Sequence, residues 1–86
     1  LNKKIMAIKT EKIDGKKILN EYISSNLLSS VYNREDKTLK VTFKGGRSYM
    51  YDKVPFQVFT KMRLSESQGK FFNREISKKY RYKEIK

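Results

Sequence analysis

The sequence contains no cysteine, no histidine and no tryptophan among its 86 residues. Without cysteine it can form neither a disulfide nor a thiolate metal site, and it has no thiol nucleophile. Without histidine it lacks the commonest metal ligand and the usual base for an activated nucleophile. The nine acidic residues are scattered and form no recognisable acid/base pair. We therefore expect a protein that is not an enzyme and that uses no metal, no cofactor and no small-molecule substrate.

Long apolar runs are also missing. No segment approaches the ~18 apolar residues that cross a bilayer, and the apolar run at residues 5–8 is too short for the core of a signal peptide. We expect no membrane partner and a cytoplasmic location. Apolar residues make up 37% of the chain, which is enough for one domain with a thin core.

Positive charge is what the sequence has in excess. Its net charge is +12, from 21 Lys and Arg against 9 Asp and Glu. The excess is densest in residues 70–86, which carry seven basic and two acidic side chains. Such a balance is typical of proteins that bind a polyanion, although it does not determine the fold.

The first 23 residues carry the weakest structural signals. Residues 1–5 precede Met6 and are expected to be extraneous to the protein. Asp14-Gly15 is a two-residue turn signal and predicts a hairpin. Alternatively, Asp14 caps a short helix with Ile18 on its apolar face, which we favour because the following residues lack strand alternation. We expect residues 1–23 to be an N-terminal extension of a domain that spans residues 24–86.

Three strands and two helices are predicted from residue 27 onward. Strands are expected at residues 28–32, 38–43 and 48–52, and the second of them alternates cleanly between apolar and polar side chains. Gly45-Gly46 marks a tight turn between the second and third strands.

Pro55 suits the first turn of a helix, and the spacing of Ser65 and Gln68 predicts a capping box for a second helix. The apolar stripe of that second helix would run through Phe72, Ile76 and Tyr80. The expected fold is α+β: a three-stranded antiparallel meander with two helices packed on one face (β-β-β-α-α), plus the N-terminal appendage.

Several short motifs in the chain occur together in one known family. They are Ser24-Ser25-Asn26-Leu27, Tyr49-Met50-Tyr51, Val54-Pro55, the Ser67-x-Gly-x-Phe-Phe-Asn73 block and the end Ile76…Tyr80-Arg81-Tyr82. The chain thereby resembles the KTSC domain, which is found alone in small bacterial and phage proteins and at the C-terminus of some lysyl-tRNA synthetases. The resemblance covers roughly residues 24–82. It implies RNA binding, the role suggested for the family.

Tyr49 and Tyr51 lie on the same face of their strand because side chains alternate. On an open sheet face they would form a stacking platform for unpaired bases. We favour the alternative, in which both rings join the core, because they form the more apolar face of this strand. Tyr49 is kept as a second choice for stacking.

Cations alternate with aromatic residues near the C-terminus, where we expect phosphate contacts and stacking by Tyr82. The alternative is a solvated helix end, whose cations interact with the helix dipole. The residues predicted to contact nucleic acid are Arg47, Lys53, Arg74, Lys78, Lys79, Arg81, Tyr82 and Tyr49.

Ser67, Gly69 and Asn73 match the small polar positions of the family motif. They could hold an anion at a helix start, but we expect helix capping by Ser65 or Ser67 and a structural hydrogen bond from Asn73.

The function predicted from the sequence is non-catalytic binding of RNA or another polyanion with little sequence specificity. The alternative is a module that docks an acidic protein, with Phe56 as an aromatic anchor. We expect a monomer or a weak dimer, the latter through pairing of an exposed first strand at residues 28–32.

Overall fold

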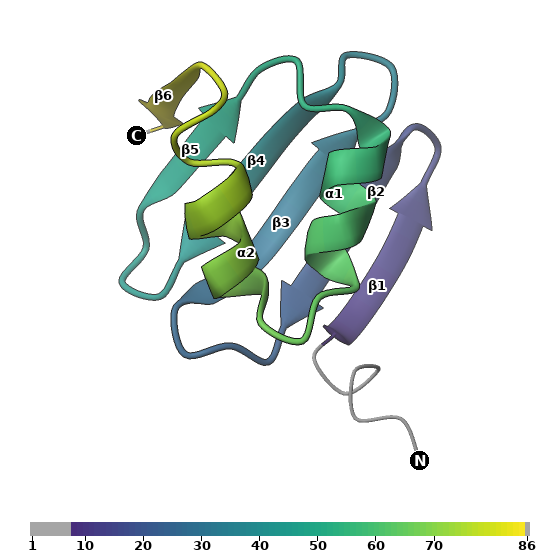
Figure 1. Cartoon of the computed structure of the whole chain (residues 1–86). Coiled ribbons are helices and arrows are strands. Elements are labelled where there is room, and N and C mark those ends of the chain that lie inside the picture. Colours follow the sequence, from purple (N-terminus) through teal and green to yellow (C-terminus); the bar gives the residue numbers. More distant parts are fainter. Residues whose placement is uncertain (1–7, 86) are drawn as a thin grey trace.

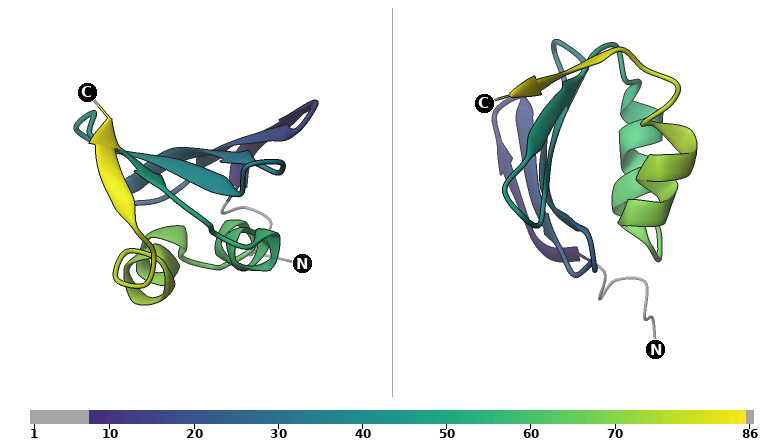
Figure 2. Two further views of the ribbon diagram at one scale, coloured as in Figure 1. Left: turned by 90° about the horizontal axis from the view of Figure 1, so that it is seen from above. Right: turned by 90° about the vertical axis from the view of Figure 1, so that its left-hand side faces the viewer.

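A computed structural model describes residues 8–85 and shows one antiparallel sheet with both helices on the same face (Figure 1). Every strand pairs with its neighbour in the sequence, in the order β1-β2-β3-β4-β5-β6. The other face of the sheet carries no helix (Figure 2). The elements are β1 Ile8–Asp14, β2 Lys17–Tyr22, β3 Leu27–Asn33, β4 Thr38–Phe43, β5 Ser48–Tyr51, α1 Phe56–Arg63, α2 Gln68–Glu75 and β6 Tyr82–Ile85.

The fold is α+β, but the prediction of a three-stranded sheet is wrong. The three expected strands are β3, β4 and β5, and the two expected helices are α1 and α2. The hairpin of β1 and β2 extends the sheet on one side, and β6 extends it on the other. As a consequence β3 is paired on both sides, so it offers no free edge to a second copy of the chain.

Residues 8–22 form a hairpin and not the helix that we favoured. Asp14 pairs with Lys17 across a turn at Gly15-Lys16, and Gly15 takes the positive φ of 61° that the turn requires. The β2 side chains that face the helices are buried, and one of them is Asn20. A polar residue at a core position hid the strand alternation. The expectation for residues 1–5 lies outside the described residues.

The second helix ends at Glu75, earlier than its apolar spacing predicted. Ile76 is fully buried and Tyr80 packs against the core, but a turn at residues 76–79 places Tyr80 there instead of a further helical turn. The chain then returns as β6, whose Tyr82 pairs with Tyr51 of β5. The basic C-terminal segment is therefore an edge strand and the turn before it.

Each helix covers a different part of the sheet. Under α1, Tyr32 of β3 stacks on Phe59 with ring centroids 4.6 Å apart, and its hydroxyl donates to the carbonyl of Val54. Under α2, Phe72 meets the rings of Phe43 and Tyr51 at 5.3 and 5.2 Å. Neither helix within residues 8–85 has the length and apolar character needed to cross a membrane.

Serine caps the second helix as expected. The Ser67 side chain accepts a hydrogen bond from the backbone N–H of Lys70 and makes Ser67 the N-cap of α2. The predicted reciprocal pair is not formed, because Ser65 bonds to Ser67 and the side chain of Gln68 donates to the carbonyl of Arg63.

Candidate nucleic-acid interface

Aromatic side chains line the helix-facing side of β5 and β6. Tyr51 is 4% exposed and belongs to the core, as favoured from the sequence, whereas Tyr49 is half-buried at its margin. Both rings lie on the side covered by α2, as the contact of Tyr51 with Phe72 shows. They therefore do not form a stacking platform on the open face of the sheet.

Tyr82 is the exposed member of this aromatic row. Its ring stacks on Tyr51 with centroids 5.2 Å apart and planes inclined by 28°, and it meets the edge of Tyr49 at 5.8 Å. These contacts fix the ring, yet 53% of the residue remains exposed. A ring held in place and open to solvent can stack on an unpaired base without first being ordered.

Three of the predicted phosphate ligands surround one hollow at the end of β5. Lys53, Lys79 and Arg81 line a cavity of about 390 Å³ together with Asp52 and Tyr80, and we call this the basic pocket. A hydrogen bond from the N–H of Asp52 to the carbonyl of Arg81 joins its two sides. Lys53 adopts a φ of 55°, a left-handed conformation that is uncommon for lysine.

Only part of this charge is neutralised by carboxylates. Glu75 accepts hydrogen bonds from Lys79 at 2.9 Å and from Arg74 at 3.0 Å, and these contacts hold the pKa of its carboxyl below the ordinary value. Lys53 and Arg81 form no ion pair within residues 8–85. Asp52 is the one acidic residue that lines the basic pocket. The pocket therefore keeps two cations available for an anionic ligand.

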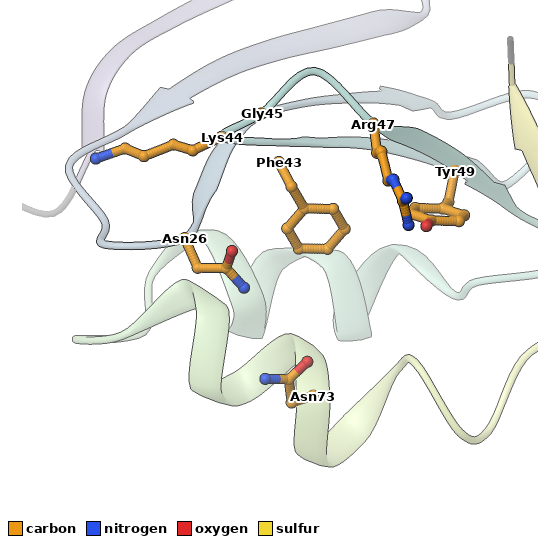
Figure 3. A pocket seen from close by; sticks show the side chains of 7 residues that line it. All are labelled: Asn26, Phe43, Lys44, Gly45, Arg47, Tyr49 and Asn73. Atoms are coloured by element: carbon orange, nitrogen blue, oxygen red, sulfur yellow. The ribbon is translucent and has the colours of Figure 1, made fainter.

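Arg47 and Tyr49 lie at the opposite end of β5 from the basic pocket. They line a second cavity of about 340 Å³, which we call the amide pocket. The four residues of β5, about 13 Å of extended chain, and the bend that begins at Asp52 separate Arg47 from Lys53. The amide pocket is lined by Asn26, Phe43, Lys44, Gly45, Arg47, Tyr49 and Asn73 (Figure 3).

The remaining predicted cations lie beside these two pockets and line neither of them. Arg74 is on α2, where its guanidinium sits 5.5 Å from the ring of Phe71 and pairs with Glu75. Lys78 is exposed in the turn that precedes Lys79. The structure thus brings together Lys53, Lys79 and Arg81 next to Tyr82, with Arg47 and Tyr49 further along the same edge.

Sequence reasoning missed several groups at this edge. Asn26 was treated only as part of a motif, and Asn73 was expected to make a structural hydrogen bond that its side chain does not make within the described chain. Glu75 was not recognised as the partner of two predicted phosphate ligands. Glu75 lies four positions before Lys79, a spacing that brings two side chains together on a helix. This spacing could have predicted the contact.

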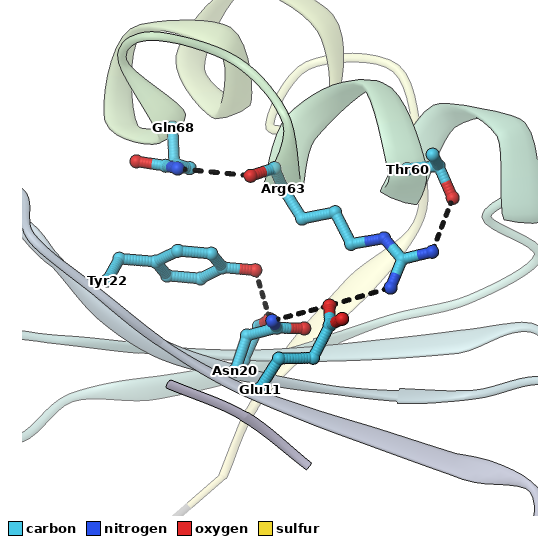
Figure 4. A network of polar contacts seen from close by, with 7 residues as sticks. Glu11, Asn20, Tyr22, Thr60, Arg63 and Gln68 are labelled. Atoms are coloured by element: carbon cyan, nitrogen blue, oxygen red, sulfur yellow. Dashed lines mark hydrogen bonds and ion pairs between the residues drawn. The ribbon is translucent and has the colours of Figure 1, made fainter. Parts of the chain in front are cut away.

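A different polar cluster lies under α1, at the other end of the sheet. The guanidinium of Arg63 donates to the Glu11 carboxylate at 2.7 Å, and the amide of Asn20 donates to the same carboxylate at 2.8 Å (Figure 4). The hydroxyls of Tyr22 and Ser30 share a buried hydrogen bond of 2.7 Å. This cluster connects β1 and β2 to the helix layer.

Comparison with known proteins agrees with this architecture. A protein-family model described as the KTSC domain matches residues 23–80, which is more than half of the chain. The chain belongs to the KTSC domain family. The crystal structure of a KTSC domain protein from Yersinia pestis is similar to this domain, with a TM-score of 0.74 and 28% identity. The match covers 79% of this chain and 96% of that one.

One curated protein is similar to this chain in sequence. A protein from Tsukamurella paurometabola is 33% identical to this KTSC domain over 58 residues, which are 67% of this chain and 87% of the relative. The family match begins at residue 23, so the β1–β2 hairpin precedes the matched region. Both pockets are built mainly from residues inside that region, with Arg81 just beyond its end.

Proposed function

We propose that this KTSC domain binds single-stranded RNA along the edge formed by β5 and β6, without catalysis and with affinity carried mainly by phosphates. One observation carries the proposal. The basic pocket places Lys53, Lys79 and Arg81 around one hollow, and Tyr82 follows Arg81 in the chain as an exposed, fixed ring. Cations beside a stacking surface are the combination that single-strand binders use.

The expected mechanism has two parts. Lysine and arginine side chains at the pocket displace counterions from the phosphate chain, which makes the affinity fall as salt rises. Tyr82 stacks on one base, a contact worth ~1–3 kcal/mol that tolerates any base. A duplex keeps its bases stacked inside the helix, so it gains only the phosphate contacts.

The first test is binding of a fluorescent ~20-mer single-stranded RNA and its duplex DNA counterpart across a salt series. If three to five phosphates are neutralised, log K for the RNA falls with log salt at a slope of roughly −2 to −3.5. Binding no tighter than ~100 μM at physiological salt, the weak end of non-specific affinity, contradicts the proposal.

Paired variants locate the surface. Lys53→Asn with Arg81→Ala removes both unpaired cations of the basic pocket, and asparagine tolerates the left-handed backbone at position 53. Lys12→Ala with Lys17→Ala removes the same charge from the β1–β2 hairpin. The first pair should lower RNA affinity about tenfold and flatten the salt slope by about 1.4, which is two phosphate contacts. Equal losses from both pairs would mean that net charge alone drives binding.

Glu75→Gln tests the role of the neutralising carboxylate. The change frees Lys79 and Arg74 from their ion pairs while it keeps a hydrogen-bonding side chain of similar shape. We expect tighter RNA binding. The slope of log K against log salt should become steeper by up to about 0.7 for each cation that gains a phosphate contact. Unchanged affinity would show that neither cation reaches the RNA.

Docking of an acidic protein is the second candidate from the sequence, and the structure supports it less. Phe56 is 39% exposed, but its ring already contacts Tyr32 and lies 5.4 and 5.5 Å from the guanidinium groups of Arg34 and Arg63. A partner that anchored on this ring would have to displace these two cations from its face. Competition by polyphosphate separates the two functions, because it displaces RNA from a phosphate-binding edge but leaves a specific protein interface intact.

A further inference from the structure

The amide pocket lies between the β4–β5 turn, the loop before β3 and helix α2 (Figure 3). Its volume of about 340 Å³ is at the lower end of the range of small-ligand pockets, roughly 300–1,000 Å³. Backbone hydrogen bonds fix its rim: the N–H of Lys44 donates to the carbonyl of Asn26, and the N–H of Phe43 donates to the carbonyl of Arg47, both at 2.9 Å. The hollow is therefore held open by the fold itself.

One wall of the amide pocket is aromatic and packed against neighbouring rings. The ring of Phe43 meets Phe72 at 5.3 Å and Tyr49 at 5.9 Å, each in an edge-to-face arrangement. Tyr49 in turn contacts Tyr82. The wall is thus continuous with the exposed ring to which the proposed function assigns stacking, and a planar ligand in the hollow would extend the same row.

Two side-chain amides, one from the loop before β3 and one from α2, supply polar groups near the ring of Phe43 (Figure 3). Asn26 and Asn73 both point toward the hollow in Figure 3, and neither side chain makes a hydrogen bond within residues 8–85. Each amide offers two donors and one acceptor oxygen. Such groups can form hydrogen bonds with the donors and acceptors on the edge of an unpaired base. Proteins that recognise single-stranded RNA use hydrogen bonds of this kind.

The charge of the amide pocket suits an anion. Arg47 and Lys44 line it, and none of its seven lining residues is acidic. The nearest carboxylate in the β5–β6 ladder is that of Glu84, which lies opposite Tyr49. Arg47 reaches down on the side of Tyr49, whereas the ammonium group of Lys44 points away from the hollow (Figure 3). Arg47 also has no ion-pair partner in the described part of the chain. An aromatic wall, two free amides and one guanidinium together match a base and its phosphate.

We propose that the amide pocket binds one unpaired nucleotide of the bound strand, with its base against Phe43 and Tyr49, its edge read by Asn26 and Asn73, and its phosphate on Arg47. The inference rests on the proposed function, and it adds a base preference at one position of an otherwise sequence-tolerant site. β5 is about 13 Å long, so the same RNA strand could extend from the amide pocket to the basic pocket at its other end.

The test compares single-stranded 8-mers of A, C and U with an abasic 8-mer that carries the same phosphates. The native protein should distinguish the three base types by at least about fivefold, because hydrogen bonds to base edges are selective whereas stacking is not. Asn26→Ala with Asn73→Ala should reduce that spread to within about twofold and leave affinity for the abasic strand unchanged. Gln57→Ala, which removes an exposed amide on α1, should preserve the spread.

A second readout reports on the pocket directly. The side-chain amide NMR signals of Asn26 and Asn73 should shift when the preferred 8-mer is added and stay in place with the abasic strand. Shifts with free mononucleotides alone would overturn the proposal in favour of a site for small nucleotides.

The two proposals fail in different ways. Salt-dependent binding of all strands with no base preference overturns the nucleotide subsite and leaves the proposed function standing. Absence of binding to every strand overturns both.

Discussion

The two ends of the sheet use their charged side chains in opposite ways. Under α1, Arg63 pairs with Glu11 and its side chain is only 15% exposed, so this cation is part of the fold. At the β5–β6 end, Lys53 and Arg81 line an open pocket without an ion-pair partner among residues 8–85. The number of basic residues does not distinguish these two roles. The positions of the carboxylates distinguish them, because Glu11 lies beside Arg63 and no carboxylate of the described chain pairs with Lys53 or Arg81.

The same contrast holds for the side chains that fill the space beneath each helix. Asn20 and Ser30 are buried beneath α1, and Gln68, the first residue of α2, is buried against the end of α1. Their hydrogen bonds compensate for the loss of water. Burial raises the pKa of the Tyr22 hydroxyl there and so keeps it neutral. The rings beneath α1, Tyr32 and Phe59, are fully buried, whereas the row of Phe43, Tyr51 and Phe72 beneath α2 includes the partly exposed Phe43. This aromatic layer continues to the surface at Tyr49 and Tyr82, where we propose that it contacts nucleic acid.

Phe72→Ala should have the largest effect, because it removes the ring on which the aromatic end is built. Truncation of a buried Phe destabilises a protein by about 3–5 kcal/mol, a large part of the stability of a domain this small. Urea unfolding should show a correspondingly lower midpoint.

Phe71→Ala is the matched control for this change. Phe71 is the adjacent residue on α2, but it is only partly buried, so its loss should lower the unfolding free energy by clearly less. Similar losses from both variants would contradict the view that Phe72, through its contacts with Phe43 and Tyr51, contributes more to stability than Phe71.

The central part of the fold could be predicted because local patterns there agree with burial. Leu39 and Val41 alternate with Lys40 and Thr42 in β4, and the first two side chains are buried. The outer strands break that agreement. Asn20 occupies a buried position of β2, and all but the last residue of β6 are exposed, so the hydrophobic pattern carried no signal for either strand.

The candidate site could be predicted only as a set of residues. Charge and aromatic content predicted four members of the site, Lys53, Lys79, Arg81 and Tyr82. Lys53 and Lys79, however, are 26 positions apart in the sequence. Only the pairing of β6 with β5 brings them to one pocket. Because β6 was not predicted, neither the pocket nor the stacking of Tyr82 on Tyr51 could be.

Tyr82→Leu should have an intermediate effect, on binding more than on stability. Leucine can still pack on Tyr51, but it offers no aromatic face to a base. The binding free energy for RNA should become about 1–3 kcal/mol less favourable. The unfolding free energy should change by less than about 1 kcal/mol, because the residue is exposed. Fluorescence titration and urea unfolding measure the two quantities on the same sample.

Phe56→Leu makes the same chemical change at the α1 end, where an aromatic ring is also partly exposed. It should leave RNA affinity unaltered. A loss there as large as that of Tyr82→Leu would move the binding surface to α1 and remove the distinction between the two ends.

The smallest effect on stability is expected from a substitution of Glu11, whose carboxylate joins β1 to α1. Burial raises the pKa of Glu11, but hydrogen bonds from Asn20 and Arg63 and the charge of Arg63 outweigh it and leave the pKa below its ordinary value. A carboxyl with a lower pKa in the folded state stabilises the fold above its unfolded pKa of ~4.3. That contribution disappears as the pH falls through the folded pKa.

Glu11→Gln should therefore make stability less dependent on pH. The urea midpoint of the native protein should fall as the pH is lowered from about 5 to about 3, and the variant should fall less steeply over the same range. Glu66→Gln, at an exposed carboxyl that pairs with no cation in the described structure, serves as the control and should follow the native curve. Parallel curves for the native protein and Glu11→Gln would show that the Arg63–Glu11 pair does not stabilise the α1 end. The contrast between the two ends would then rest on the burial of Arg63 and not on the energy of its ion pair.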